Sequence, residues 1–110
     1  STFEQARIDL DRLIQAGAPP ESLCLGLPFY GRRIDKFNAL TDYRKIVAAH
    51  PNLTADLDEV AGVFFNGPAT IGRKAAEARA RGLAGVMIWE LSADLPPDDP
   101  RSLLRAIWGD

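Results

Sequence analysis

Several features that mark specialised proteins are missing from this chain. Its 110 residues include one cysteine, Cys24, which lies between two leucines and is predicted to be a small buried side chain without a disulfide partner in the chain. The one histidine, His50, has no cysteine or acidic residue at ligand spacing, so we predict no metal site and no cofactor. No apolar run reaches the ~18 residues of a membrane span, and the first residues do not resemble a signal peptide.

Neither sign of charge dominates. The chain has 13 lysines and arginines against 15 aspartates and glutamates, and its pI is near 5.3. This balance argues against nucleic acid or an anionic membrane surface as a partner. Basic residues gather at Arg73, Lys74, Arg79 and Arg81, but Glu77 interrupts them, and we interpret them as the solvated surface of a helix. With 46% hydrophobic residues, the composition is that of a small globular unit.

The apolar stretch from Leu83 to Trp89 organises the rest of the chain. It follows Gly82, which ends the preceding helix because glycine enters the left-handed conformation at little cost. The stretch does not alternate between apolar and polar residues, so it predicts a strand of a parallel sheet that is covered on both faces. It ends on Trp89, Glu90 and Ser92, at the end of the strand where α/β proteins place groups that contact ligands.

Apolar residues at three- and four-residue spacing predict helices in four places. The ranges are residues 2–16, 41–50, 70–81 and the last residues of the chain. The caps that we expect are Ser1 or Thr2, Thr41 and Thr70, with a stop at Gly17. In the last helix, the side chains predicted to face inward are Leu103, Leu104, Ile107 and Trp108.

A second apolar strand is predicted over residues 22–29, ending near Pro28 because proline has no amide donor. Residues 30–33 then form a loop, and residues 60–67 form a short extended segment that ends in a turn at Asn66 and Gly67. A helical crossover joins the two apolar strands, so they should be parallel. Because two strands do not complete a buried sheet, the chain is predicted to be a piece of a larger α/β sheet, or to complete one by association.

Four stretches together resemble the carboxyl-terminal part of family 18 glycoside hydrolases, the chitinases. They are residues 23–32, 65–74, 82–94 and 102–107, in this order along nearly the whole chain. The resemblance implies that residues 1–110 are part of a (β/α)8 TIM barrel, with 22–29 as its seventh strand, 84–89 as its eighth and 2–16 as its sixth helix. A whole barrel takes about 250 residues. The extra α+β domain that many relatives insert between these strands has no counterpart here.

The family's catalytic signatures are missing from this chain. The resemblance implies cleavage of β-1,4-linked N-acetylglucosamine polymers with retention, in which a glutamic acid protonates the glycosidic oxygen and the substrate's own N-acetyl carbonyl attacks the anomeric carbon. The fourth-strand signature Asp-x-x-Asp-x-Asp-x-Glu has no match, since residues 56–59 (Asp-Leu-Asp-Glu) break its spacing. The sixth-strand Met-x-Tyr-Asp motif is also missing. We therefore expect no catalytic residue in this segment, and the 110 residues alone should be inactive.

The resemblance implies that Trp89, Tyr30 and Arg32 bind substrate. Trp89 matches the eighth-strand tryptophan that lies beneath the sugar at the cleavage point, and an apolar ring face can stack on a pyranose. Tyr30 and Arg32 match positions that line the groove, where a phenol and a guanidinium can hydrogen-bond hydroxyls and acetamides. Without the resemblance, Trp89 would be interpreted as a core side chain, and Tyr30 and Arg32 as a rim tyrosine and a surface arginine.

The predicted function is therefore part of a chitinase-like hydrolase, for which this segment supplies the floor and one wall of the sugar groove. Its expected partners are chitin or N-acetylglucosamine oligosaccharides and the rest of the barrel, and the resemblance implies a secreted protein. Two alternatives stay open. One is a catalytically silent chitin-binding lectin on the same barrel. The other is a stand-alone α/β module that self-associates through its open sheet edges.

Overall fold

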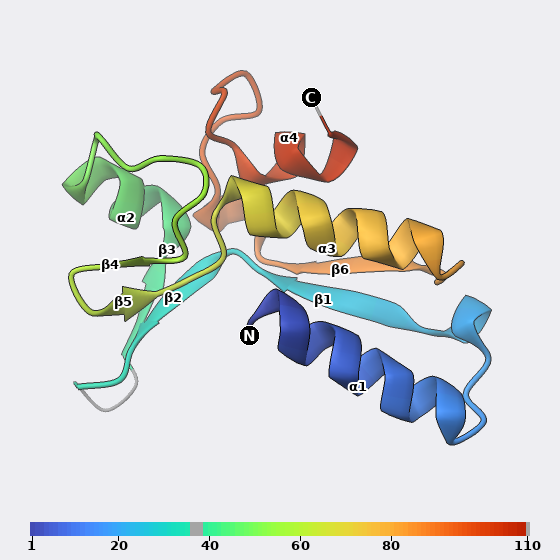
Figure 1. Ribbon diagram of the computed structural model, residues 1–110. Helices are drawn as coiled ribbons and strands as arrows, with labels where there is room; N and C mark the ends of the chain where they lie inside the picture. The colour runs from blue at the N-terminus through green and yellow to red at the C-terminus, as the bar shows by residue number, and fades with distance from the viewer. Residues whose placement is uncertain (36–38, 110) are drawn as a thin grey trace.

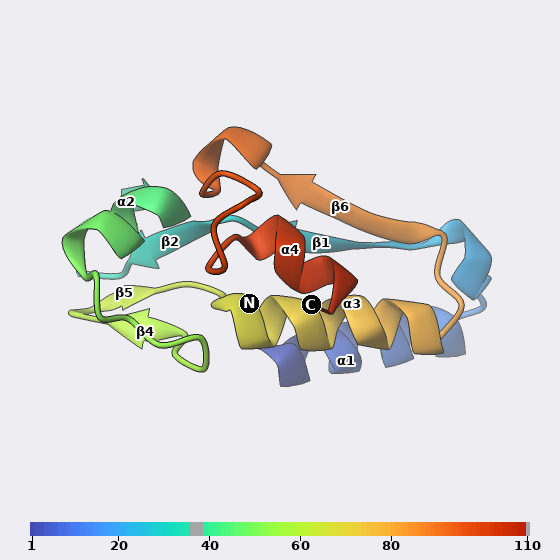
Figure 2. The same cartoon turned by 90° about the horizontal axis from the view of Figure 1, so that it is seen from above.

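The computed structural model describes residues 1–35 and 39–109. Two parallel strands and the helices beside them form the larger of the two parts of the fold. The elements are β1 (Cys24–Pro28), β6 (Gly85–Trp89), α1 (Phe3–Gln15), α3 (Pro68–Ala80) and α4 (Leu103–Trp108), with short 3-10 helices at Pro20–Ser22 and Leu91–Ala93. Figure 1 shows β1 and β6 side by side with α3 running along them, and Figure 2 shows α1 and α3 on the same side of the strand pair. The predicted parallel pair is confirmed, in a register that places Cys24 opposite Gly85 and Pro28 opposite Trp89.

The two faces of the strand pair differ in burial. Leu27 is 2% exposed, and Leu25 and Ile88 pack against the same core. On the other face, Met87 is 55% and Trp89 63% exposed. The prediction that the strand is covered on both faces is therefore wrong for the described residues, because the helices that they contribute lie on one side. For the same reason the prediction that Cys24 is buried is wrong, since it lies on the open face and is exposed.

Helix α1 has the predicted ends. The Thr2 hydroxyl accepts a hydrogen bond from the Gln5 amide at 3.0 Å, and Gly17 follows the helix with a φ of 104°. The cap predicted at Thr41 is wrong, because α2 (Tyr43–Ala49) begins after Asp42.

Helix α3 begins earlier than predicted. Gly67 is its N-cap and Pro68 its first residue, a position that suits proline because the missing amide needs no partner there. Thr70 therefore lies inside the first turn, and its hydroxyl donates to the Asp58 carboxylate at 2.6 Å. The turn predicted at Asn66 and Gly67 is in fact the entry to this helix.

The segment between β1 and α3 forms a small antiparallel sheet. Its order is β3-β2-β5-β4, where β2 is Tyr30–Arg33, β3 is Ala39–Asp42, β4 is Glu59–Val60 and β5 is Val63–Phe64. The loop predicted for residues 30–33 is therefore wrong, because β2 pairs with chain that is distant in sequence, such as Phe64 opposite Arg32. The turn of the β4–β5 hairpin lies at Ala61 and Gly62, which have positive φ values of 50° and 81°. In Figure 1 this sheet and α2 lie to the left of the parallel strands.

A shared core joins the small sheet to the larger part of the chain. The Tyr43 ring lies 6.3 Å from that of Phe65, and the Tyr43 hydroxyl donates to the carbonyl of Arg101 at 2.8 Å. Burial raises the pKa of Tyr43 to about 12, so this donor keeps its proton at neutral pH. In α4, Leu103 and Ile107 are buried as predicted, but Trp108 is 70% exposed, so its predicted inward position is wrong.

Candidate functional site

The carboxyl ends of β1 and β6 meet the small sheet at one place. Parallel strands end at the same edge of a sheet, and here Pro28 lies opposite Trp89 while the Phe29 amide donates to the Trp89 carbonyl at 2.7 Å. Strand β2 begins directly afterwards at Tyr30, and Figure 1 shows the N-terminus beside the same junction. The local sequence Pro-Phe-Tyr thus carries the chain from the parallel pair into the antiparallel sheet without an intervening loop.

Two adjoining hollows lie at this junction. The smaller measures about 220 Å³, and its lining includes Gly26, Met87, Trp89 and Tyr30. The larger measures about 410 Å³, and its lining includes Tyr30, Arg32, Asp58, Phe64 and Asn66. Ser1, Pro28 and Tyr30 line both hollows. We call the two adjoining hollows together the groove.

The structure brings the three predicted site residues to this groove. Trp89 lies on the open face of β6, and the peptide bond between Trp89 and Glu90 is cis. Tyr30 is half-buried where the two hollows meet, and Arg32, two residues further along β2, is exposed in the larger one. One apolar ring, one phenol and one guanidinium therefore converge from two elements, a combination that offers stacking area and hydrogen-bond donors to a sugar. Their roles in binding remain predictions.

Asp94, four residues after Glu90 in the sequence, stabilises the start of α4. Its carboxylate accepts hydrogen bonds of 2.8 to 2.9 Å from the amides of Leu95, Leu103 and Leu104 and from the hydroxyl of Ser102. These donors belong to the first turn of α4 and the loop before it, where a carboxylate is favourable. Asp94 is buried, whereas Glu90 is exposed, so the two do not form a carboxylate pair.

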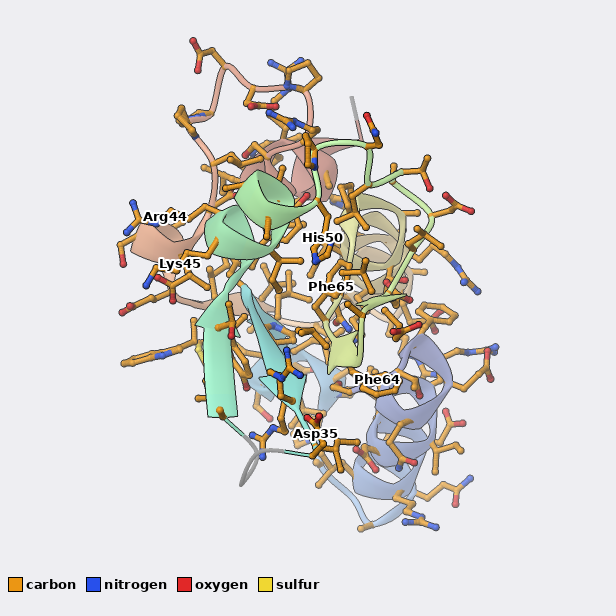
Figure 3. The ribbon with its side chains drawn as sticks, turned by 90° about the vertical axis from the view of Figure 1, so that its left-hand side faces the viewer. Asp35, Arg44, Lys45, His50, Phe64 and Phe65 are labelled. Carbon is orange, nitrogen blue, oxygen red and sulfur yellow. The ribbon has the colours of Figure 1, made fainter. Side chains whose placement is uncertain are left out.

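Phe64 and Phe65 follow each other in sequence but have different surroundings. Phe65 is buried beside Tyr43 of α2, whereas Phe64 is 52% exposed and lines the larger hollow with Ser1 and Thr2. Figure 3 shows Phe65 on the side of His50 and Phe64 on the side of α1. Phe64 is thus a groove residue that the sequence alone did not identify.

Lys74 is the second residue of the site that sequence reasoning missed. It is fully buried, so the interpretation of the basic cluster as solvated surface is wrong at this position. Its ammonium group donates to Asn66 Oδ1 at 2.6 Å, to the Ser1 carbonyl at 2.8 Å and to Ser1 Oγ at 2.9 Å. Burial lowers the pKa of Lys74 to about 8, although the nearby Asp58 carboxylate opposes this shift. The sequence did carry a signal that Lys74 is buried. It lies three residues after Ile71 and four before Ala78, and both of these residues lie on the buried face of α3.

Over residues 1–35 and 39–109, no group of three or more His, Cys, Asp or Glu side chains could hold a metal ion. Within the same ranges, no helix combines the length and apolar character needed to cross a membrane.

The fold and the groove define an α/β unit of parallel strands whose carboxyl ends carry the candidate site, the arrangement of TIM-barrel proteins. The family model for glycosyl hydrolases family 18 matches residues 4–94. The chain therefore belongs to this family, as the sequence motifs predicted.

Solved structures and curated relatives agree with this assignment. The GH18 chitinase ChiB of Flavobacterium johnsoniae is 33% identical with a TM-score of 0.83, and the match covers 97% of this chain and 34% of that one. Chitinase 1 of Aphanocladium album is 26% identical over 113 residues, covering 78% of this chain and 26% of its own length. A chitinase-like agglutinin of Robinia pseudoacacia is 25% identical with a TM-score of 0.66, covering 89% of this chain and 34% of that one. The chain thus spans between a quarter and about a third of the length of these proteins.

Proposed function

We propose that this chain is the carboxyl-terminal part of a chitinase-like glycoside hydrolase that cleaves β-1,4-linked N-acetylglucosamine polymers. Residues 1–110 contribute the last two β/α units of the barrel, with β1 as the seventh strand and β6 as the eighth. The observation that carries the proposal is the uncovered ring of Trp89 at the carboxyl end of β6, in a groove that Tyr30 and Arg32 also line. The family 18 match and the chitinase relatives support the same activity.

Each groove residue has a proposed role. Trp89 forms the floor on which one N-acetylglucosamine ring stacks, because a flat apolar ring fits the C–H face of a pyranose. Tyr30 and Arg32 form a wall that hydrogen-bonds hydroxyl and acetamide groups. The acid that protonates the glycosidic oxygen, in a retaining mechanism assisted by the substrate's acetamide, comes from residues upstream of this chain. The segment alone is inactive, and the intact protein acts outside the cytoplasm.

The open face of the strand pair supports a larger barrel. Met87 and Trp89 are more than half exposed, and among the described residues no further strand pairs with either edge of the two-stranded sheet. Buried parallel sheets are normally covered on both faces and paired at both edges. In this proposal the missing strands pair with β1 and β6, and their side chains cover Cys24 and Met87.

The test is Trp89→Ala in the native gene product, with Trp108→Ala as the matched control because it deletes an equally large, more exposed ring outside the groove. Hydrolysis of chitooligosaccharides should fall roughly 30-fold or more, equivalent to ~2 kcal/mol, while thermal unfolding shows that the fold survives. Trp108→Ala should hydrolyse at the wild-type rate. A folded Trp89→Ala variant with wild-type turnover would contradict the assignment of Trp89.

Two other outcomes would identify the alternatives. Binding of chitooligosaccharides without hydrolysis, lost in Trp89→Ala, would indicate a lectin; the match to a chitinase-like agglutinin is the specific observation that keeps this reading open. A gene product whose polypeptide mass is near 12.0 kDa, which self-associates and has no affinity for these sugars, would indicate a stand-alone module.

A further inference from the structure

A buried ammonium group lies directly behind the groove. Lys74 is fully buried in α3, and its three hydrogen bonds all go to neutral oxygens, one on Asn66 and two on Ser1. The Asn66 side-chain amide also donates to the Ser1 carbonyl, at 2.9 Å. Lysines are seldom fully buried without a charged partner, because removing the ammonium from water is unfavourable. These contacts tie together Ser1, which lies ahead of the α1 cap, the loop before α3, and α3 itself.

These contacts do not depend on what covers the open face of the strands. An exposed side chain such as Phe64 can be covered when further chain packs against this segment, so its exposure here does not define its surroundings in a longer protein. A side chain that is already fully buried keeps its burial when more chain is added. Lys74 and Asn66 are both buried within the described residues, at 0% and 4% exposure.

A second set of contacts fixes the same loop from the other side. The Asp58 carboxylate accepts hydrogen bonds from the Gly67 amide at 2.8 Å and from the Thr70 hydroxyl at 2.6 Å. A side chain at position 67 would not fit, because a Cβ there would lie 2.3 Å from the carbonyl oxygen of Leu57. The backbone at the start of α3 is therefore held on one side by Asp58 and on the other by Lys74 through Asn66.

The residues held in this way form part of the groove. Ser1, Asp58 and Asn66 line the larger hollow together with Tyr30 and Arg32. We propose that Lys74 is a positioning residue that, by binding Ser1 and Asn66 at once, fixes the groove wall facing Tyr30 and Arg32. Lys74 does not reach a ligand itself, since it is buried behind that wall. That the ligand is an N-acetylglucosamine oligosaccharide rests on the proposed function. That Lys74 positions Ser1 and Asn66 does not depend on it.

The three hydrogen bonds that Lys74 donates to Ser1 and Asn66 depend on the protonation of its amino group. An ammonium group has three donors for the three acceptors, but a neutral amine has only two. The charged group that acts on Lys74 is the Asp58 carboxylate, which raises the pKa of the lysine. Because burial lowers the pKa of Lys74 to about 8, raising the pH through this value should leave one of the three acceptors without its donor.

The first test is hydrogen exchange on the native gene product, which requires no ligand. Lys74→Met removes the donors and keeps an unbranched apolar chain, and Lys45→Met is the matched control at an exposed lysine of α2, on the far side of the molecule from α1 in Figure 3. Peptides covering residues 1–6 and 64–70 should exchange about tenfold faster in Lys74→Met, while those of residues 43–49 stay unchanged. Unchanged exchange in residues 1–6 and 64–70 would overturn the proposal.

A second variant decides the matter if Lys74→Met does not fold. Asn66→Asp places a carboxylate against the ammonium group, which raises the pKa of Lys74. In the wild type, the protection of residues 1–6 and 64–70 should weaken as the pH rises through about 8, and in Asn66→Asp this loss should occur at higher pH. If Lys74 served only to fill space, the pH of this loss would be the same in both proteins, and the proposal would fail.

A binding measurement then separates this inference from the proposed function. With the tetramer of N-acetylglucosamine as the probe, a folded Lys74→Met at neutral pH should show a KM about fivefold higher with kcat nearly unchanged; failing that, the wild type should show the higher KM above pH 8. An unchanged KM would overturn the link to the groove. If the wild type neither binds nor cleaves the tetramer, the proposed function fails, while the exchange experiment still decides whether Lys74 positions Ser1 and Asn66.

Discussion

The two faces of the β1–β6 pair carry the same kind of sequence and have opposite surroundings. One face presents Leu25, Leu27, Val86 and Ile88 to the helices and the core, and the other presents Cys24, Met87 and Trp89 without cover from the described residues. A strand with one face in water normally alternates between apolar and polar residues, whereas a strand buried on both faces does not. Among the described residues the apolar run is covered on one face, so burial of the other face stays a prediction for the longer protein proposed above. The open face is the part of the structure that supports a larger barrel.

The largest stability change should come from the covered face. Leu27→Ala removes a side chain that is 2% exposed, so the free energy of unfolding should fall by about 2–5 kcal/mol through lost burial and a new cavity. Chemical denaturation of the native gene product measures this loss. A loss below about 1 kcal/mol would mean that the helices do not cover this face in solution.

Met87→Ala makes the comparison sharper, because its effect depends on what covers the open face. In the surroundings described here Met87 is half-exposed, and its truncation should lower the free energy of unfolding by less than about 1 kcal/mol. Inside a closed barrel the same truncation should lower it by about 2–5 kcal/mol. We expect the larger value in the native gene product. If Met87→Ala lowers the free energy of unfolding by less than about 1 kcal/mol, the strand pair remains open on one side in the native gene product.

Features fixed by local chemistry were predictable from the sequence. The Thr2 cap and Gly17 stop of α1 follow from the preferences of single residues, and the parallel pairing follows from two apolar runs joined by a helix. The motifs also predicted the family correctly. Tyr30, Arg32 and Trp89 line the groove, and their role in binding stays a prediction.

Features that depend on distant contacts were not predictable. Strand β2 was expected to be a loop, and its partner β5 lies beyond α2 in the chain, so the pairing could not be read from the local sequence. Lys74 was assigned to the surface on its charge, since sequence alone did not show that Ser1 and Asn66 would supply acceptors. Trp108 was assigned to the core on its apolar character, but α4 is short and buries only Leu103 and Ile107 fully.

The smallest effect that we predict lies within the groove. Tyr30→Phe removes one hydroxyl and keeps the ring that lines both hollows. One hydrogen bond between neutral groups contributes about 0.5–1.5 kcal/mol, so the Kd for the tetramer of N-acetylglucosamine should rise roughly 2- to 13-fold. The free energy of unfolding should not change, because the substitution leaves the packing of the open face as it was. Isothermal titration and thermal unfolding of the same variant separate the two quantities. A variant with unchanged affinity would assign Tyr30 to the rim of the groove, and a loss of stability without a loss of affinity would assign its hydroxyl to the fold.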